Sequence, residues 1–388
     1  MERMEKTFFE KRGGLAVEKI ELNAPSLKGE IYIGRGAAKE RLPRLTEGQK
    51  NFVVTDSNVF SLYGTFFSEY FAKSEIFVLP AGEESKNFEA LSEILTRMTR
   101  VGLHRSSRLF AVGGGVVGDI GGLAAALYMR GISCVQVPTT LLAQVDSGVG
   151  GKTAVDLCGV KNIVGAFHQP CEVVADPDFF STLPPREIKC GLGEIVKYAA
   201  LNEEIFDRLK AMENIDVCES GGWEFLISLL APCIKHKARV VEADEKETGE
   251  RKSLNVGHTT GHALELSSSM SHGESVLWGM WFETALAVKY GVCGEEYGGE
   301  LMQIVRRALA VPPRQAPDFD TIGKAAEKAR SDKKNTDDGL IRMAVAADRG
   351  KWAMLSLPFL EYRDGLERLA ARWKNGIGTA EDENRMLR

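Results

Sequence analysis

The chain lacks the cysteine patterns that hold disulfide scaffolds or zinc clusters together. Its seven cysteines are odd in number and scattered, and no two of them form a C-x-x-C pair. This spacing argues against a disulfide framework and against a metal site built from paired cysteines. A protein of a reducing cytoplasm is therefore the simplest interpretation.

The chain also lacks a strong net charge and long apolar runs. Its formal net charge is −5 over 388 residues, so an anionic ligand would need a local basic cluster. No apolar run approaches the roughly 20 residues that cross a bilayer. The first residues, MERMEKTFFEKRGG, are too charged for a signal peptide. We therefore expect neither nucleic acid nor a membrane as a partner.

Short strand-like runs alternate with helical patterns in the first half of the chain. Residues 51–56, 75–80, 109–115 and 133–138 have the pattern of buried strands, and 87–101 is an amphipathic helical pattern. Such alternation predicts a parallel sheet with crossover helices, and ligands at the carboxyl ends of its strands.

The pattern changes near Pro184 and Pro185, and the length of the chain fits two domains. Beyond these prolines, helical patterns dominate, at 188–201, 203–212, 225–242, 258–267, 276–290 and 299–308. We predict an α/β, Rossmann-like domain with a parallel sheet at 1–182 and a mostly α-helical domain at 183–373. The polar residues 374–388 are predicted to be a disordered tail.

Two glycine clusters lie between Gly113 and Lys152. The first, GGGVVG at 113–118, follows a strand pattern, opens an Ala-rich helical pattern and nearly matches the G-x-G-x-x-G fingerprint. The second ends in GGK at 150–152. Glycines at a strand-to-helix turn let backbone amides approach an anion. Two such loops predict one or two phosphate-bearing ligands, whereas a turn that merely permits close helix packing is the alternative for the first.

Three of the six histidines lie within fifteen residues. His258 and His262 are four residues apart and so share one helix face, and His272 follows in SHGES. Glu194, in GLGEIVKY, offers a carboxylate. Histidine and glutamate ligands suit a catalytic zinc with an open position. A surface pair or a capping role is the alternative for the first two histidines.

Further charged and amide side chains lie in glycine-rich or motif-like contexts. They are Asp146, Lys152, Lys161, Asn162, Lys197, Lys237, Glu247, Arg251 and Asn255. A single lysine is most often a solvated surface charge. Lys197 differs because it follows Glu194 by about one helical turn and shares its face. Lys152 differs because GGK after a turn resembles loops that cradle phosphate, although no Walker A motif fits.

Long strings of the chain, in order, resemble the 3-dehydroquinate synthases of the sugar-phosphate cyclase group. The strings are PAGEESK, GGGVVGDIGGLAAALYMRG, VPTTLLAQVDSGVGGKTAVD, VKNIVGAFHQP, TLPPREIKCGLGEIVKY, DEKETGERKSLNVGHTTGHALE, HGESVLWGM and DKK. The resemblance implies an N-terminal α/β domain that binds NAD and a helical domain that holds a divalent metal, zinc or cobalt. It also implies an active site in the cleft between them.

The resemblance also implies roles for individual residues. The implied metal ligands are Glu194, His258 and His272. The resemblance therefore implies that His262 contacts the substrate and is not a metal ligand. The implied cofactor residues are Asp56 at the adenosine ribose, with Asn58, Glu83, Lys86, Gly114, Gly115, Val116, Asp119, Thr139, Thr140, Lys161 and Thr182.

The implied substrate is 3-deoxy-arabino-heptulosonate 7-phosphate, an anion at both ends. The residues implied around its phosphate are Lys152, Asn162, Asn255, His262 and either Lys333 or Lys334. Arg130 would reach in from the second subunit of a homodimer. Arg251 and Lys237 would face the carboxylate and the ring hydroxyls. Asp146 and Lys197 complete the catalytic set, with Glu247 paired to His262 as a proton relay.

The implied reaction is an NAD-dependent transient oxidation, phosphate elimination, re-reduction and intramolecular aldol closure to 3-dehydroquinate in the shikimate pathway. One alternative is another cyclase of the group, which makes a deoxy-inosose or valiolone. A second is a metal-dependent polyol dehydrogenase that consumes NAD, and a third is a non-catalytic homologue. The chain departs from the family pattern at Gly148, where serine or another small residue is usual, and at Gly193, where alanine is usual.

Overall fold

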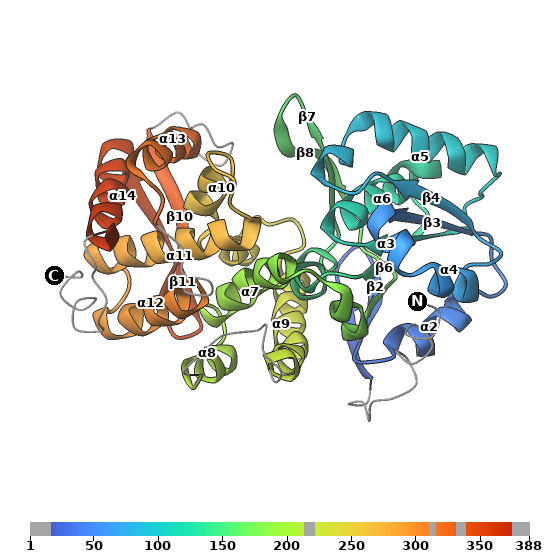
Figure 1. Cartoon of the computed structure of the whole chain (residues 1–388), viewed down its shortest axis with the longest axis horizontal. Coiled ribbons are helices and arrows are strands. Elements are labelled where there is room, and N and C mark those ends of the chain that lie inside the picture. The colour runs from blue at the N-terminus through green and yellow to red at the C-terminus, as the bar shows by residue number, and fades with distance from the viewer. Residues whose placement is uncertain (1–16, 213–221, 310–315, 331–338, 375–388) are drawn as a thin grey trace. The chain divides into compact units, whose positions relative to one another are not determined.

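The computed structural model describes residues 17–212, 222–309, 316–330 and 339–374. The chain divides into two units (Figure 1). The first runs to Ile188 and includes Ile234–Lys246, and the second comprises Lys189–Cys233 and the residues from Glu247 onward. The domain division at 182/183 stays a prediction. Lys333, Lys334 and the tail beyond Lys374 lie outside the described residues.

A seven-stranded sheet forms the centre of the first unit, in the order β1-β2-β9-β6-β5-β3-β4. Its strands are β1 Glu18–Asn23, β2 Lys28–Ile33, β3 Asn51–Asp56, β4 Glu75–Leu79, β5 Arg108–Gly113, β6 Ser133–Pro138 and β9 Glu172–Ala175. Every neighbouring pair is parallel except β1 with β2. The predicted parallel sheet is confirmed.

Helices cover both faces of this sheet. Successive β3 residues point to opposite faces: Val53 packs with α2 (Ala37–Thr46) and α4 (Gly64–Tyr70). Phe52 packs on the other face with α5 (Phe88–Arg100) and α6 (Gly115–Leu127). Figure 1 shows α5 on the opposite side of β3 and β4 from α2 and α4. Strands that are buried on both faces are expected to be largely apolar. This is why these strands could be predicted from short apolar runs in the sequence. The short helix α3 (Ser57–Leu62) follows β3 directly.

An antiparallel hairpin, β7 (Lys152–Leu157) and β8 (Val160–Phe167), forms a separate two-stranded sheet in the first unit, and β7 contacts α6. The second glycine cluster therefore leads from a π-helical turn, Ala143–Ser147, into a strand. The expectation of a second strand-to-helix loop is wrong for this cluster, because no helix N-terminus follows it.

The second unit is mostly helical, as predicted. Its helices are α7 Pro185–Ala199, α8 Glu203–Lys210, α9 Gly222–Ala243, α10 His258–Glu265, α11 His272–Lys289, α12 Glu295–Leu309, α13 Phe319–Arg330 and α14 Phe359–Lys374, of which α7 begins and α9 ends in the first unit. Helix α11 is buried along nearly its whole length, as expected of a core helix.

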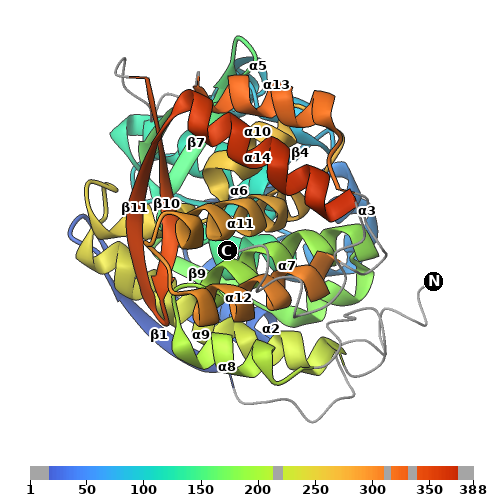
Figure 2. The ribbon, with the colours of Figure 1, turned by 90° about the vertical axis from the view of Figure 1, so that its left-hand side faces the viewer.

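The sequence patterns did not reveal a second hairpin, β10 (Leu340–Asp348) and β11 (Lys351–Pro358). It lies within the helical unit, where β10 contacts α10, α11 and α12 (Figure 2). Among the described residues, no helix combines the length and hydropathy that crossing a membrane requires.

A buried carboxyl follows β9 in the first unit. Asp176 is fully buried and accepts hydrogen bonds from the backbone nitrogens of Gly36 (3.2 Å), Ala38 (3.0 Å) and Asp178 (3.0 Å). Burial, reinforced by the nearby Asp178 carboxylate, raises the pKa of Asp176 to about 7, although the three backbone donors oppose this shift.

This raised pKa predicts a pH-dependent contribution to stability. The unfolded chain releases the proton near the ordinary value of 3.8, whereas the folded protein holds it up to about pH 7. The contribution is therefore full below about pH 4 and is lost as the pH rises through about 7. Asp176→Asn, neutral throughout, should remove it. Denaturant unfolding should show the wild type losing stability relative to the variant between about pH 4 and about pH 7, with little further change above that range. An unchanged difference would contradict the prediction.

Candidate active site and metal centre

Several of the predicted nucleotide residues lie at or just beyond the carboxyl ends of the parallel strands of the first unit. The chain passes from β3 outward to β4 and returns to β5 on the other side of β3, which creates a change of direction between β3 and β5. Ligands of open α/β sheets bind at such switch points. Asp56 ends β3 and Gly113 ends β5, so both flank this point.

The first glycine cluster forms the turn between β5 and α6. Gly114 precedes the helix, and Gly115 and Val116 form its first turn, so their backbone amides stand at a helix N-terminus. The backbone nitrogen of Thr139 donates to Gly113 O at 2.9 Å, which brings the Thr139–Thr140 pair after β6 beside the turn. The structure thus groups the glycine turn with both predicted threonines.

Two of the predicted cofactor residues also have local structural roles. Asp56 caps α3, because its Oδ1 accepts from the backbone nitrogens of Asn58 (2.9 Å) and Val59 (3.0 Å). The Thr182 hydroxyl lies 2.6 Å from the Tyr63 hydroxyl, at the end of the 3₁₀ helix Pro177–Thr182.

A buried lysine, Lys86, contacts two other predicted site residues of the first unit. Lys86 Nζ lies 2.5 Å from Asp119 Oδ2 and donates to Asn162 Oδ1 on β8. Burial raises the pKa of Asp119, and the Lys86 ammonium opposes this shift. Lys161 and Glu83, which flank this cluster in sequence, are 3.8 Å apart across a more exposed ion pair.

A second lysine–carboxylate pair fixes the π-helical turn. Lys237 on α9 forms an ion pair with Asp146 and also donates to the Asp146 backbone oxygen at 2.7 Å. Lys152, by contrast, is exposed at the first position of β7. Arg130 is exposed too, with a positive φ of 68° in the turn that follows α6.

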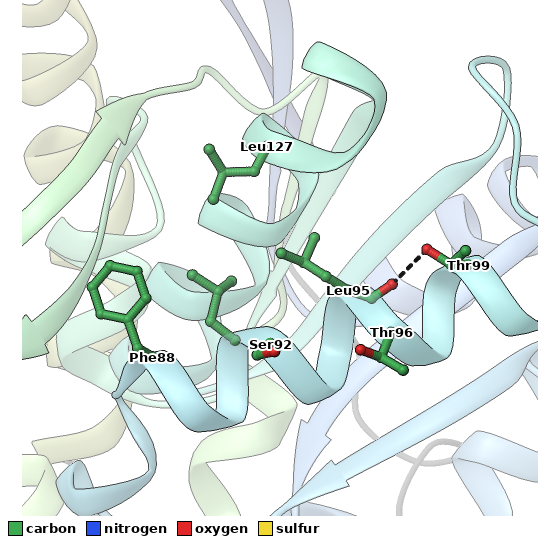
Figure 3. A pocket seen from close by; sticks show the side chains of 7 residues that line it. Phe88, Ser92, Leu95, Thr96, Thr99 and Leu127 are labelled. Atoms are coloured by element: carbon green, nitrogen blue, oxygen red, sulfur yellow. Dashed lines mark hydrogen bonds between the residues drawn. The ribbon is translucent and has the colours of Figure 1, made fainter.

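An apolar groove of about 310 Å³ lies on the surface between α5 and the end of α6 (Figure 3). It is lined by Phe88, Leu91, Ser92, Leu95, Thr96, Thr99 and Leu127. None of these side chains carries a charge or a metal ligand. The groove is therefore not the site expected for an anionic sugar phosphate.

In the second unit, three helices bring one carboxylate and three imidazoles together. Glu194 on α7 is fully buried, and its Oε1 lies 3.5 Å from His258 Nε2 and 2.9 Å from His272 Nε2. Its Oε2 lies 2.5 Å from Lys197 Nζ. His262, on the same helix as His258, completes a group in which one donor atom of each histidine lies within 4.8 Å of the others.

The donors of this cluster fit a divalent metal. His258 shares a hydrogen bond of 3.0 Å between Nδ1 and the Val256 backbone oxygen, and His272 one of 2.9 Å between Nδ1 and Glu265. In each ring Nε2 is the atom that faces Glu194. Metal-binding histidines commonly engage their second nitrogen in this way. Glu194, His258 and His272 therefore fit as metal ligands. His262 lies near enough to them to be a further candidate ligand.

The electrostatics of the cluster favour the ligand forms of Glu194 and His258. Burial opposes ionisation of Glu194, but Lys197 and the two imidazoles outweigh it and hold the pKa of this carboxyl well below its ordinary value. Burial lowers the pKa of His258. Burial also opposes charge on His272, yet its hydrogen bonds to Glu194 and Glu265 raise its pKa to about 10.

The other predicted residues of the second unit gather around the 3₁₀ helix Glu250–Asn255. Arg251 is almost fully buried there, at 1% exposure. The Asn255 amide donates to Glu247 Oε1 at 2.5 Å, and Glu247 has a positive φ of 59°. The structure therefore places Glu247 against Asn255, and the predicted pairing of Glu247 with His262 stays a prediction.

Sequence reasoning missed two acids of this unit. Glu265, at the end of α10, contacts the ligand candidate His272. Glu283, on α11, accepts from the backbone nitrogens of Gly257 (2.9 Å) and Thr260 (2.7 Å) and so caps the helix that carries His258. Glu265 is part of the string HALE, but its position in the sequence does not indicate that it contacts His272. Glu283 lies in a mostly apolar stretch of α11, where no motif indicates a role for an acid.

Comparison with known proteins gives two adjoining family matches. Residues 76–190 match the model of the 3-dehydroquinate synthase N-terminal region, and residues 191–335 match that of its C-terminal region. The chain is 41% identical over 335 residues to the 3-dehydroquinate synthase of Pelotomaculum thermopropionicum, covering 84% of this chain and 89% of that protein.

Two solved structures have a similar fold. The 2-epi-5-epi-valiolone synthase of Streptomyces hygroscopicus, with NAD+ and Zn2+ bound, is 27% identical with a TM-score of 0.76, covering 89% of this chain and 98% of that one. A 2-deoxy-scyllo-inosose synthase with carbaglucose-6-phosphate, NAD+ and Co2+ is 24% identical with a TM-score of 0.77, covering 90% and 99%.

The metal cluster depends on a close approach of α7 and α11. A Cβ on Gly193 would overlap the backbone of Gly273, the residue after His272. Gly193→Ala should therefore push the helices apart, destabilise the protein by about 1–3 kcal/mol and weaken divalent-metal binding. Denaturant unfolding and metal titration would measure both effects.

Gly323→Ala is the matched control, since it makes the same change within a helix where a Cβ meets nothing within 4 Å. It should leave metal binding unchanged and stabilise the protein by about 0.5–1 kcal/mol. Wild-type stability and metal affinity in Gly193→Ala would refute the role given to this helix contact.

Proposed function

Because the chain belongs to the 3-dehydroquinate synthase family, we propose that it converts 3-deoxy-arabino-heptulosonate 7-phosphate into 3-dehydroquinate and phosphate. Such an enzyme is a carbon–oxygen lyase of the shikimate pathway, which leads to aromatic amino acids. The observation that carries the proposal is the convergence of Glu194, His258 and His272 on one buried point of the second unit.

We infer NAD and a divalent metal, zinc or cobalt, as cofactors. The similar valiolone synthase binds NAD+ and Zn2+, and the helix N-terminus and the histidine cluster described above fit these groups. When bound, NAD removes and returns a hydride at a substrate carbon, while the metal polarises the hydroxyl there.

The residues of the switch point in the first unit would hold the dinucleotide. Asp56, at the end of β3, would accept from the ribose hydroxyls, and the amides of Gly115 and Val116 would donate to the pyrophosphate. Lys86 and Asp119 balance each other's charge, so they would orient neutral groups of the cofactor rather than supply net charge.

Lys152 and Asn162 would bind the phosphate that leaves. Lys152 is exposed at the start of β7, opposite Phe167, whereas Asn162 lies on β8 nearer the turn of the hairpin, where it contacts Lys86. Departing phosphate can accept the substrate proton itself, so these residues need mainly to hold it in the productive orientation. The Lys333–Lys334 pair, expected at the same phosphate, lies outside the described residues.

Glu194, His258 and His272 would be the metal ligands, and His262 would act on the substrate. Glu194 supports this choice, because it is a buried carboxylate held in its ionised form and faces Nε2 of the other two. Arg251 would bind the substrate carboxylate through its guanidinium, a group that suits bidentate contacts.

We also infer a cytoplasmic homodimer. Leu127 and Met129 are 50% and 44% exposed and closely precede Arg130, the residue expected to reach a second subunit, so pairing there would bury apolar surface. The described cysteines are free thiols, which suits a reducing compartment. Sedimentation of the wild type and of an Arg130→Ala variant, with activity of each, would test the dimer and the residue separately.

The ligand assignment predicts a separation between metal content and turnover. His258→Ala should lose bound metal and activity. Lys152→Ala should retain metal and lose about 100-fold or more in kcat, because a phosphate contact is missing. His262→Ala should also retain metal with reduced turnover. Metal analysis and phosphate release would measure both properties. Full activity in the first two variants, or metal loss in His262→Ala, would contradict the assignment.

The reaction predicts that NAD is required only in catalytic amounts. Metal-loaded protein, given less NAD than substrate, should release phosphate and form 3-dehydroquinate over many turnovers without net NADH. Stoichiometric NADH would indicate a polyol dehydrogenase instead. Turnover only with glucose 6-phosphate or sedoheptulose 7-phosphate would indicate another cyclase of the group.

A further inference from the structure

His272 is the most exposed of the three proposed metal ligands. Its side chain is 28% exposed, against 8% for His258 and 0% for Glu194. It is also the first residue of α11, directly after the short connection from α10. Because the His272 ring is partly exposed and stands at a helix end, the surrounding packing does not fix its orientation. Its orientation therefore depends on specific contacts.

Glu265 makes the contact that fixes the far side of this ring. Its Oε2 lies 2.9 Å from His272 Nδ1, while Nε2 of the same ring lies 2.9 Å from Glu194 Oε1. Glu265 is the last residue of α10, the helix that also carries His258 and His262. The contact therefore ties the orientation of His272 to the helix that bears the other histidines.

The chemistry of this contact favours metal binding through Nε2. A carboxylate that accepts from Nδ1–H leaves the proton on Nδ1 and the lone pair on Nε2, and it makes the imidazole a stronger donor. His258 uses the neutral backbone oxygen of Val256 for the same purpose. Of the two proposed histidine ligands, His272 alone has a charged side chain at Nδ1, so a change at Glu265 acts first on this ligand.

The position of Glu265 in its helix indicates that helix stability is not the reason for an acid there. Negative charge at the C-terminal end of a helix interacts unfavourably with the helix dipole, where basic residues are preferred. The acid is thus placed against the local preference and toward the ring of His272.

We propose that Glu265 is a positioning residue that holds the His272 ring with Nε2 directed to the metal. This inference rests on the proposed function, because it takes His272 as a ligand. Glu265 does not itself bind the metal, since its carboxylate contacts the ring nitrogen opposite the one that faces Glu194.

The test uses the full-length protein. Chelator competition measures its affinity for Zn2+ and Co2+. The visible spectrum of the Co2+ form and the thermal melting of the metal-free form are recorded as well. Glu265→Gln keeps the length of the side chain and removes its charge, and Glu265→Ala removes the contact. We expect affinity to fall by about 10- to 100-fold, most in the alanine variant, with an altered Co2+ spectrum. The melting temperature of the metal-free variants shows how much fold stability each change costs. A loss of affinity that follows a loss of melting temperature, with an unaltered Co2+ spectrum, would contradict the proposal.

Ser267→Ala is the matched control, because it removes another contact at the same helix end, the 2.7 Å hydrogen bond from Ser267 Oγ to the Ala263 oxygen. It should leave metal affinity and the Co2+ spectrum unchanged. A loss of affinity in this control as large as that in Glu265→Ala would overturn the proposal, since a general loosening of α10 would then suffice.

His272→Ala separates failure of this inference from failure of the proposed function. If His272→Ala loses metal while Glu265→Ala keeps wild-type affinity, the positioning role is refuted and the ligand set stands. If His272→Ala itself keeps wild-type affinity, the ligand set is wrong and Glu265 has no ligand to orient.

Discussion

The burial of the Glu194 carboxylate is the constraint on which the second unit depends. An unpaired charge in a protein interior costs several kcal/mol, and Glu194 is fully buried. Lys197, itself only 1% exposed, compensates one carboxylate oxygen from the same helix face. The other oxygen needs donors from elsewhere, and His258 and His272 provide them from two further helices. The cluster that we propose as the metal centre therefore also compensates the charge of a buried carboxylate.

Close packing of α10 and α11 accompanies the burial of Glu194. The backbones of α10 and α11 touch where a Cβ on Gly279 would overlap the Gly257 oxygen. Glu283, another buried acid, reaches from α11 to two amides at the start of α10. A buried carboxylate that accepts backbone hydrogen bonds satisfies donors that the helix itself leaves unpaired. The helices that carry the histidines are therefore joined through polar as well as apolar contacts.

The sequence alone predicted those parts of the molecule that depend on short-range patterns. Strands 51–56 and 133–138 were placed at their observed ends, because strands buried on both faces are continuously apolar. Spacing placed His258 and His262 on one helix face. The hairpin of β7 and β8 was not predicted, because apolar and polar residues do not alternate clearly along β8. Its apolar residues Val160 and Ile163 are exposed. The Lys237–Asp146 pair joins residues 91 positions apart, a distance over which no pattern in the chain extends.

Charge balance within the first unit distinguishes two kinds of basic residue. Lys86 and Lys237 each have a carboxylate partner and are nearly buried, so these pairs hold side chains in place while adding no net charge. Such pairs suit the hydroxyl and amide groups of a nucleotide, which need orientation. A phosphate dianion needs net positive charge or unpaired amides. Under the proposed function, the exposed Lys152 would face the leaving phosphate, and the amides at the start of α6 would face the pyrophosphate of the cofactor.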